Sequence, residues 1–322
     1  MTTSTAGGAP VRDRLRSALA TATARLGAAG VPSPSVDARA LIALAARTDQ
    51  PLVMLDHLPE GFDEDLEALI GRREAREPLQ LIQGYAAFRR LRLEVAPGVF
   101  IPRPETELAV DLLQQHHRGP LGRVADLCTG SGALAAALLD ELPEVHVTAV
   151  DVDAAAVALA RRNTAPWARR AEVLQADLTT APDTTTGGEP GLERLSPLDA
   201  IVSNPPYVPP GAVPQDEEVR RHDPPRALYG GGEDGLDLPR AVIAWAHRLL
   251  RPGGLLVMEH ADVQGEATRA LAARIGGFED VATCRDLTGR DRFLVARRTA
   301  ATAAGFGSTE RPEGRAMTEV RD

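Results

Sequence analysis

Apolar residues recur at helical spacing through the first quarter of the chain. The first such segment carries Val11, Leu15, Ala18, Leu19, Ala22 and Leu26, and it is closed by Gly30, Pro32 and Pro34. Two more segments of this kind follow at residues 36–47 and 62–76, and no strand-like alternation interrupts them. The pattern predicts a small all-α domain over residues 10–78, preceded by a disordered tail at residues 1–9.

Beyond residue 99, short apolar strands alternate with helices. The strands are predicted at residues 124–127, 145–150, 172–174, 200–203, 255–259, 280–283 and 292–296. Helices are predicted at residues 133–141 and 153–163, the second with Asp153 as its N-cap. This alternation predicts an α/β domain over residues 99–298, built on a mostly parallel, seven-stranded sheet with crossover helices.

Three stretches fit neither domain. Residues 79–98 contain aromatic and aliphatic side chains alternating with arginine, which predicts a β-hairpin or linker. Residues 181–197 and 299–322 are rich in small, polar or charged residues without apolar periodicity. We expect a flexible surface insertion at the first of these and a disordered tail at the second.

The composition is that of a globular protein, with 43% hydrophobic and 25% charged residues. No apolar run is long enough to predict a membrane span, and the start of the chain lacks the pattern of a secretory signal. Two cysteines predict neither a disulfide framework nor a zinc site, so we expect no metal and a cytoplasmic protein. The formal net charge of −9 argues against nucleic acid as the substrate and favours a partner with a basic contact surface.

A glycine-rich turn follows the first predicted strand, in Val124-Ala-Asp-Leu-Cys-Thr-Gly-Ser-Gly132. Gly130 and Gly132 have no Cβ, which allows a sharp turn and a close approach to a ligand. Asp151 comes 19 residues after Gly132, at the end of the next predicted strand, where a carboxylate can accept hydrogen bonds from ribose hydroxyls. The pattern predicts a nucleoside site; a purely structural turn and a dinucleotide site are the alternatives.

Two further acidic residues favour S-adenosylmethionine as the nucleoside. Asp126 precedes the turn and can face the cationic amino group of this cofactor. Ala135 stands where the third glycine of a dinucleotide fingerprint would be sought. Asp177 follows the third strand and can accept from the adenine amino group, with Leu178 against the ring; the alternative role of Asp177 is that of a turn residue.

The segment Asn204-Pro-Pro-Tyr207 follows the fourth predicted strand, at the edge where parallel sheets bind ligands. The Asn204 side-chain oxygen and the Pro205 carbonyl can accept both hydrogens of a planar NH2 group, while Tyr207 packs on its face. An amide or aromatic amine is a poor nucleophile, so these acceptors would act by orientation and electrostatics. The alternative is a proline-rich turn without chemistry.

Other reactive side chains have structural interpretations. Cys128 is typical of a small buried hydrophobe. His260 ends the fifth predicted strand as a hydrogen-bonded residue, and His116 and His117 lie where a helix dipole favours them.

Over residues 11–298 the sequence resembles the release-factor glutamine-N5 methyltransferases, the bacterial HemK/PrmC family. The resemblance is carried by Glu77-Pro-Leu-Gln-Leu-Ile-Gln-Gly84, Phe100-Ile-Pro-Arg-Pro-Glu-Thr-Glu107, the glycine turn, Ser203-Asn-Pro-Pro-Tyr207, Asp234-Gly-Leu-Asp237, Arg251-Pro-Gly-Gly254, Glu259-His260 and Gln264-Gly-Glu266. The Ile-Pro-Arg-Pro-Glu-Thr-Glu stretch separates this family from related enzymes that modify a ribosomal-protein glutamine. A Rossmann-like methyltransferase domain with a helical substrate-recognition domain is therefore expected.

The resemblance implies a role in translation termination, by methylation of the Gly-Gly-Gln glutamine of peptide-chain release factors. It places cofactor contacts at Cys128, Thr129, Gly130, Ser131, Gly132, Asp151, Leu178 and Asn204. It places glutamine contacts at Asn204, Pro205, Pro206 and Tyr207, with Asn204, Pro205 and Tyr207 as the catalytic set. Cys128 stands where many relatives have glycine, and Leu178 where some have an aromatic residue. The alternatives are an adenine-N6 or guanine-N2 nucleic-acid methyltransferase, and a cofactor-binding protein without catalysis.

Overall fold

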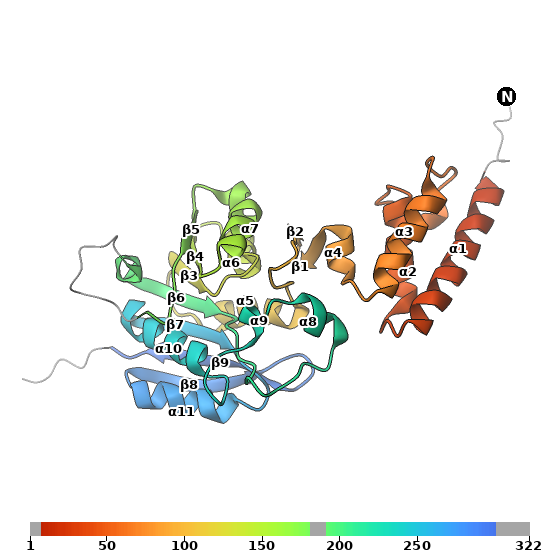
Figure 1. The fold of residues 1–322 in the computed structure, drawn as a ribbon. Coiled ribbons are helices and arrows are strands. Elements are labelled where there is room, and N and C mark those ends of the chain that lie inside the picture. Colours follow the sequence, from red (N-terminus) through yellow and green to blue (C-terminus); the bar gives the residue numbers. More distant parts are fainter. Residues whose placement is uncertain (1–7, 181–190, 301–322) are drawn as a thin grey trace, which may run out of the picture.

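The N-terminal part of the chain is a bundle of helices. The computed structural model describes residues 8–180 and 191–300, beginning with α1 (Gly8–Ala28), α2 (Pro34–Ala45), the 3-10 turn η1 (Leu52–Met54) and α3 (Phe62–Glu74). Leu26, Leu41, Ile42 and Phe62 are buried where these helices meet. The three predicted helices are therefore confirmed, and Figure 1 shows them standing apart from the sheet.

A short connecting region links the helices to the sheet. It consists of α4 (Leu79–Gln83), β1 (Tyr85–Phe88), β2 (Leu91–Glu94), the 3-10 turn η2 (Pro104–Glu107) and α5 (Leu108–His116). The predicted hairpin is present, because β1 and β2 pair antiparallel. Ile82 packs in the core of the helical bundle, whereas Phe88 and Leu93 pack in the core of the sheet. The boundary between the two cores therefore lies inside the region expected to be a linker.

All seven predicted strands are present in one sheet. In the order β5-β4-β3-β6-β7-β9-β8, they are β5 (Ala171–Gln175), β4 (His146–Asp151), β3 (Arg123–Leu127), β6 (Leu198–Ser203), β7 (Leu250–Glu259), β9 (Asp291–Arg298) and β8 (Phe278–Arg285). The first five are parallel, and β9 runs antiparallel to both of its neighbours. After β3 the chain adds β4 and β5 towards one edge of the sheet, and after β6 it adds β7 towards the other edge. The connections that follow β3 and β6 therefore lead to opposite sides, which leaves a crevice at the carboxyl ends of these two strands.

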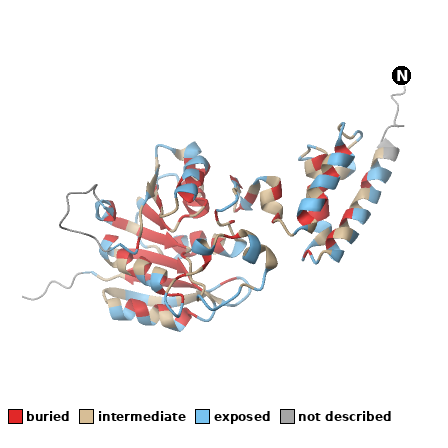
Figure 2. Ribbon diagram, viewed as in Figure 1, coloured by how far each residue is buried: buried red, intermediate tan, exposed pale blue. Residues whose placement is uncertain are grey.

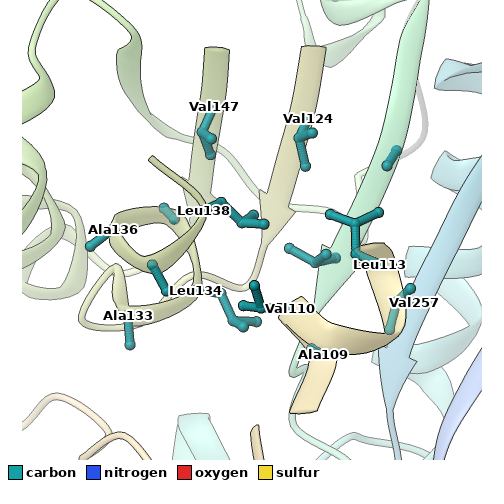
Figure 3. Packing of buried hydrophobic residues seen from close by; sticks show 14 of the residues in the cluster. Ala109, Val110, Leu113, Val124, Ala133, Leu134, Ala136, Leu138, Val147 and Val257 are labelled. Carbon is teal, nitrogen blue, oxygen red and sulfur yellow. The ribbon is translucent and has the colours of Figure 1, made fainter. Parts of the chain in front are cut away.

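Helices cover both faces of the sheet because successive strand residues point to opposite sides. Val124 and Val257 face α5 and α6 (Ala133–Glu141), as Figure 3 shows, while Ala125 and Met258 face α10 (Asp237–Leu249) and α11 (Gly265–Ile275). The remaining elements are α7 (Ala154–Thr164), η3 (Ala165–Trp167), η4 (Leu192–Leu195), α8 (Glu217–His222) and α9 (Pro225–Leu228). Figure 2 shows that burial is concentrated in the central strands and on the inner sides of these helices.

Two expectations about irregular segments need correction. Leu192 and Leu195, inside the segment 181–197 expected to be a flexible insertion, are buried in the core and lie on η4. Residue 8, expected in a disordered tail, begins α1. Residues 1–7, 181–190 and 301–322 lie outside the described residues, and so do the expectations that fall on them. Among the helices that the structure describes, none has the length and apolar character to cross a membrane.

Candidate active site

A cavity of about 550 Å3 opens at the carboxyl ends of β3, β4, β5 and β6. This volume lies in the range of small-molecule sites. Its lining includes all of the predicted site residues except one: Asp126, Cys128, Thr129, Gly130, Ser131, Asp151, Asp177, Leu178, Asn204, Pro205, Pro206 and Tyr207. The exception is Gly132, where an added Cβ would come within 3.0 Å of Ala160. Gly132 therefore allows α6 and α7 to pack closely, and it lies behind the cavity wall.

The turn after β3 has the backbone geometry that its glycines predict. Gly130 has a φ of +55°, and Cys128 adopts a φ of +61°, a conformation that favours glycine. Burial raises the pKa of the Cys128 thiol well above its ordinary value, so this side chain stays protonated. The thiol is thus a small apolar part of the wall, although Cys128 is half-buried rather than buried as expected.

Asp126 is a buried acid with one oxygen left unpaired. Its Oδ2 accepts from Thr129 Oγ1 at 2.5 Å and from the Ala135 amide at 3.1 Å. Its Oδ1 has no hydrogen-bond partner among the described residues. Burial raises the pKa of Asp126 to about 7, although the bond from Thr129 opposes the shift. Asp126 lines the cavity, and a buried carboxylate with an unpaired oxygen suits a cationic ligand group.

Asp151, the last residue of β4, ties the glycine turn to the neighbouring strand. Its Oδ2 accepts from the Gly130 amide at 2.8 Å and its Oδ1 from the Asp153 amide at 3.0 Å. Desolvation raises its pKa, and these backbone donors reduce the shift. Each carboxylate oxygen can accept a second hydrogen bond, so Asp151 can also hold hydroxyl groups in the cavity.

Asp177 combines the two roles considered for it. Its Oδ1 accepts from the Thr179 amide at 2.8 Å and from the Thr179 hydroxyl at 2.7 Å, which makes it a turn residue and lowers its pKa. It also lines the cavity beside Leu178. Leu178 is buried and is fixed by its carbonyl, which accepts from the Trp245 indole at 2.9 Å.

The Asn204 segment is held by side chains from distant parts of the chain. Asn204 Nδ2 donates to Thr106 Oγ1 at 3.0 Å, and Thr106 Oγ1 donates to Glu259 Oε2 at 2.7 Å. The Tyr207 hydroxyl donates to Glu259 Oε1 at 3.1 Å. Gln264 Nε2 donates to the Tyr207 carbonyl at 2.8 Å. These contacts fix both ends of the segment.

The tyrosine hydroxyl is not arranged as an acid–base group. Burial raises the pKa of Tyr207, and the neighbouring Glu259 raises it further. Burial also raises the pKa of Glu259, while hydrogen bonds from Thr106 and Tyr207 lower it. Tyr207 therefore keeps its proton and presents its ring to the cavity.

Several cavity residues were missed by the sequence analysis. Phe100 and Arg103 line the cavity from the segment before η2, with the guanidinium 5.1 Å from the centre of the ring. Arg103 also pairs with the buried Asp223 carboxylate. Phe100, Arg103 and Thr106 all belong to one motif quoted for the resemblance, and Glu259, which is outside the cavity lining, belongs to another. The sequence thus carried a signal for these residues without assigning them a role.

The sheet, the cavity and its acidic lining, together with the family matches that follow, identify an S-adenosylmethionine-dependent methyltransferase. The family called Methyltransferase small domain matches residues 90–216, and PrmC N-terminal domain matches residues 17–84. The chain is 45% identical to the release factor glutamine methyltransferase of Mycolicibacterium smegmatis, over 89% of this chain and 99% of the relative. It is 43% identical to that of Streptomyces coelicolor, over 87% and 96%.

The chain belongs to the release factor glutamine methyltransferase family. A solved methyltransferase structure from Pyrococcus furiosus is also similar, with a TM-score of 0.47 and 18% identity over 73% of this chain and 98% of that one.

Proposed function

We propose that this enzyme transfers the methyl group of S-adenosylmethionine to the side-chain amide nitrogen (N5) of the Gly-Gly-Gln glutamine in peptide-chain release factors. The observation that carries the proposal is the Asn204 segment, whose amide is anchored by its nitrogen while its oxygen is left for a ligand. Membership of a family named for this reaction supports the same substrate. Release factors act during translation, so we also propose a cytoplasmic location.

Residues in three parts of the cavity would hold the cofactor. Asp126 Oδ1, which has no partner among the described residues, would accept from the amino group of the methionine part. Asp151 would hold the ribose hydroxyls, and Asp177 with Leu178 would contact the adenine. The turn from Cys128 to Ser131 would lie beneath the ligand. When bound, the cofactor supplies an electrophilic methyl group.

The side chains of the Asn204 segment would orient the accepting nitrogen. Asn204 Oδ1 and the Pro205 carbonyl would each accept one hydrogen of the glutamine NH2 group, and the Tyr207 ring would cover the amide plane. The amide lone pair is delocalised, so reaction depends on aiming this nitrogen at the methyl group. The nitrogen would gain the methyl group as the sulfur–methyl bond breaks and S-adenosylhomocysteine leaves, and it would lose one proton to solvent, without a covalent enzyme intermediate.

The helical N-terminal part would recognise the release factor. No motif of the cofactor or amide site lies in it, and it is joined to the catalytic part by ion pairs of Arg73 and Arg76 with Glu218. The net charge of −9 disfavours a nucleic-acid substrate, the leading alternative.

The deciding experiment incubates the enzyme with methyl-labelled S-adenosylmethionine and three acceptors. These are a purified release factor, the same factor with its loop glutamine changed to alanine, and an oligonucleotide. We expect label on the first acceptor alone. Label on the oligonucleotide and not on the release factor would support the nucleic-acid alternative.

A further inference from the structure

A buried hydrogen-bond chain stands behind Asn204, outside the set of residues assigned to cofactor and substrate. Thr106 and Glu259 are 5% and 3% exposed. They come from η2 and from the end of β7, and they reach Asn204 and Tyr207 through the three bonds described above. Because these groups are buried, each donor and acceptor needs a partner, and the order of donation is constrained.

The chemistry of Glu259 sets the direction of every bond in this chain. An ionised carboxylate can only accept, so the single hydroxyl hydrogen of Thr106 must point to Glu259. Thr106 Oγ1 then has only lone pairs to offer to Asn204. The amide nitrogen of Asn204 must therefore face Thr106, and its oxygen must face the other way, into the cavity.

Both oxygens of Glu259 accept a hydroxyl hydrogen, one from Thr106 and one from Tyr207, which is the arrangement around an ionised carboxylate. Burial raises the pKa of Glu259 above its ordinary value, while these two hydrogen bonds and the positive charge of Arg292 on β9 oppose the rise. A protonated Glu259 could donate to Thr106, and Thr106 could then donate to the Asn204 oxygen. Protonation would thus turn the amide around and remove the acceptor from the cavity.

We propose that Thr106 and Glu259 are positioning residues, which orient the Asn204 amide so that its oxygen receives the substrate NH2 group. The inference deepens the proposed function and rests on it for the identity of the amide substrate. It gives the Pro-Glu-Thr-Glu segment a role in the chemistry, although Thr106 need not touch the substrate.

The orientation can be tested without any substrate. The chain contains only two asparagines, Asn163 and Asn204, so asparagine labelled with 15N on its side chain gives two amide nitrogen signals, each with a pair of protons. Asn163 serves as an internal reference, because its Nδ2 donates to the carbonyls of Ser131 and Glu94. In Thr106→Val, we expect the Asn204 amide protons to lose their protection from solvent exchange while those of Asn163 keep theirs. Unchanged protection at Asn204 would overturn the proposal.

Kinetics test the consequence for catalysis. Thr106→Val should lower kcat for release factor by roughly tenfold to a hundredfold, as loss of an outer-shell hydrogen bond does at metal sites. KM for the release factor and the Kd of the cofactor should not change. Thr106→Ser keeps the hydroxyl and should restore most of kcat. Thr164→Val removes another buried hydroxyl, which donates to the Ala160 carbonyl at 2.8 Å, and should leave kcat unchanged.

A double-mutant cycle separates positioning from general stability. In an Asn204→Ala background, Thr106→Val should cost nothing further in kcat, because the group it orients is gone. An equal loss in both backgrounds would overturn the proposal and assign Thr106 a structural role. The wild-type enzyme could transfer no methyl group to release factors while Thr106→Val still removes the exchange protection of the Asn204 amide. In that case the proposed substrate is wrong, and the orientation of Asn204 by Thr106 and Glu259 is supported.

Discussion

Replacing Asp126 with asparagine removes the negative charge that the cavity offers to the cofactor amino group. The two side chains have nearly the same shape, and the oxygen of asparagine can still accept from Thr129 and Ala135. The group facing the cavity then becomes an NH2 donor, which repels an ammonium. A hydrogen bond to a charged group contributes about 1.5–3 kcal/mol, so the Kd of the cofactor should rise roughly 10- to 150-fold.

The pH dependence of binding provides a second measurement on the same residue. In the free protein the pKa of Asp126 is about 7, and binding of an ammonium requires the carboxylate form. Affinity should therefore weaken about tenfold per pH unit below pH 7. In Asp126→Asn this dependence should disappear. S-adenosylhomocysteine carries the same amino group and avoids turnover, so it is the titrant for calorimetry.

The stability of the ligand-free protein should depend on pH in the opposite sense to its affinity for the cofactor. An acid whose pKa is raised on folding destabilises the folded state, increasingly as pH rises from its ordinary pKa to the raised one. A shift from 3.8 to about 7 corresponds to roughly 4 kcal/mol as an upper figure. The Tm of Asp126→Asn relative to wild type should thus be higher at about pH 8 than at about pH 5.

Asp13→Asn, in an exposed ion pair with Arg16, is the matched control and should change neither the Kd of the cofactor nor the Tm. The assignment of Asp126 to the amino group would be refuted if Asp126→Asn bound the cofactor as tightly as the wild type does. It would also be refuted if the affinity of the wild type did not depend on pH.

Three further substitutions follow from the same geometry. Asn204→Ala should reduce methylation of release factor by about two to three powers of ten while its affinity for that factor changes little, as measured by label transfer and KM. Tyr207→Phe should retain more activity than Tyr207→Ala, because the ring covers the amide and the hydroxyl only donates to Glu259; equal losses would contradict this. Arg73→Met should lower the free energy of unfolding by about 3–5 kcal/mol in denaturant titrations, since the buried Asp37 carboxylate loses its partner, whereas Glu218 keeps Arg76. Arg14→Met, in an exposed pair, should lower it by no more than about 1 kcal/mol.

The features predictable from sequence are those that depend on neighbours in the chain. The strand–turn–helix around Gly130 and the position of Asp151 follow from local pattern and from the rule that parallel strands end at one edge. Leu192 and Leu195 were misjudged because two apolar residues in a polar stretch give no periodicity, although they are buried in the folded chain.

The contacts behind Asn204 could not be predicted in this way. Thr106 and Glu259 lie 153 positions apart and meet only because η2 crosses the end of β7. A motif can identify such residues as belonging to a family, but their roles depend on which atoms donate and which accept. The hydrogen-bond partners of a threonine hydroxyl are known only from the folded structure. They distinguish a threonine that orients a neighbouring side chain from one that only packs against it.

The segment between Tyr207 and α10 joins the two ends of the proposed reaction. Glu218 on α8 binds Arg73 and Arg76 of the helical part, and both arginines are largely buried. Asp223, a few residues later, holds Arg103 at the cavity, three positions before Thr106. The same segment thus forms ion pairs with the part that would recognise the release factor and with a wall of the cavity that would hold its glutamine. A substrate docked on the helices would therefore contact a part of the protein that is joined by ion pairs to the segment reaching the cavity wall.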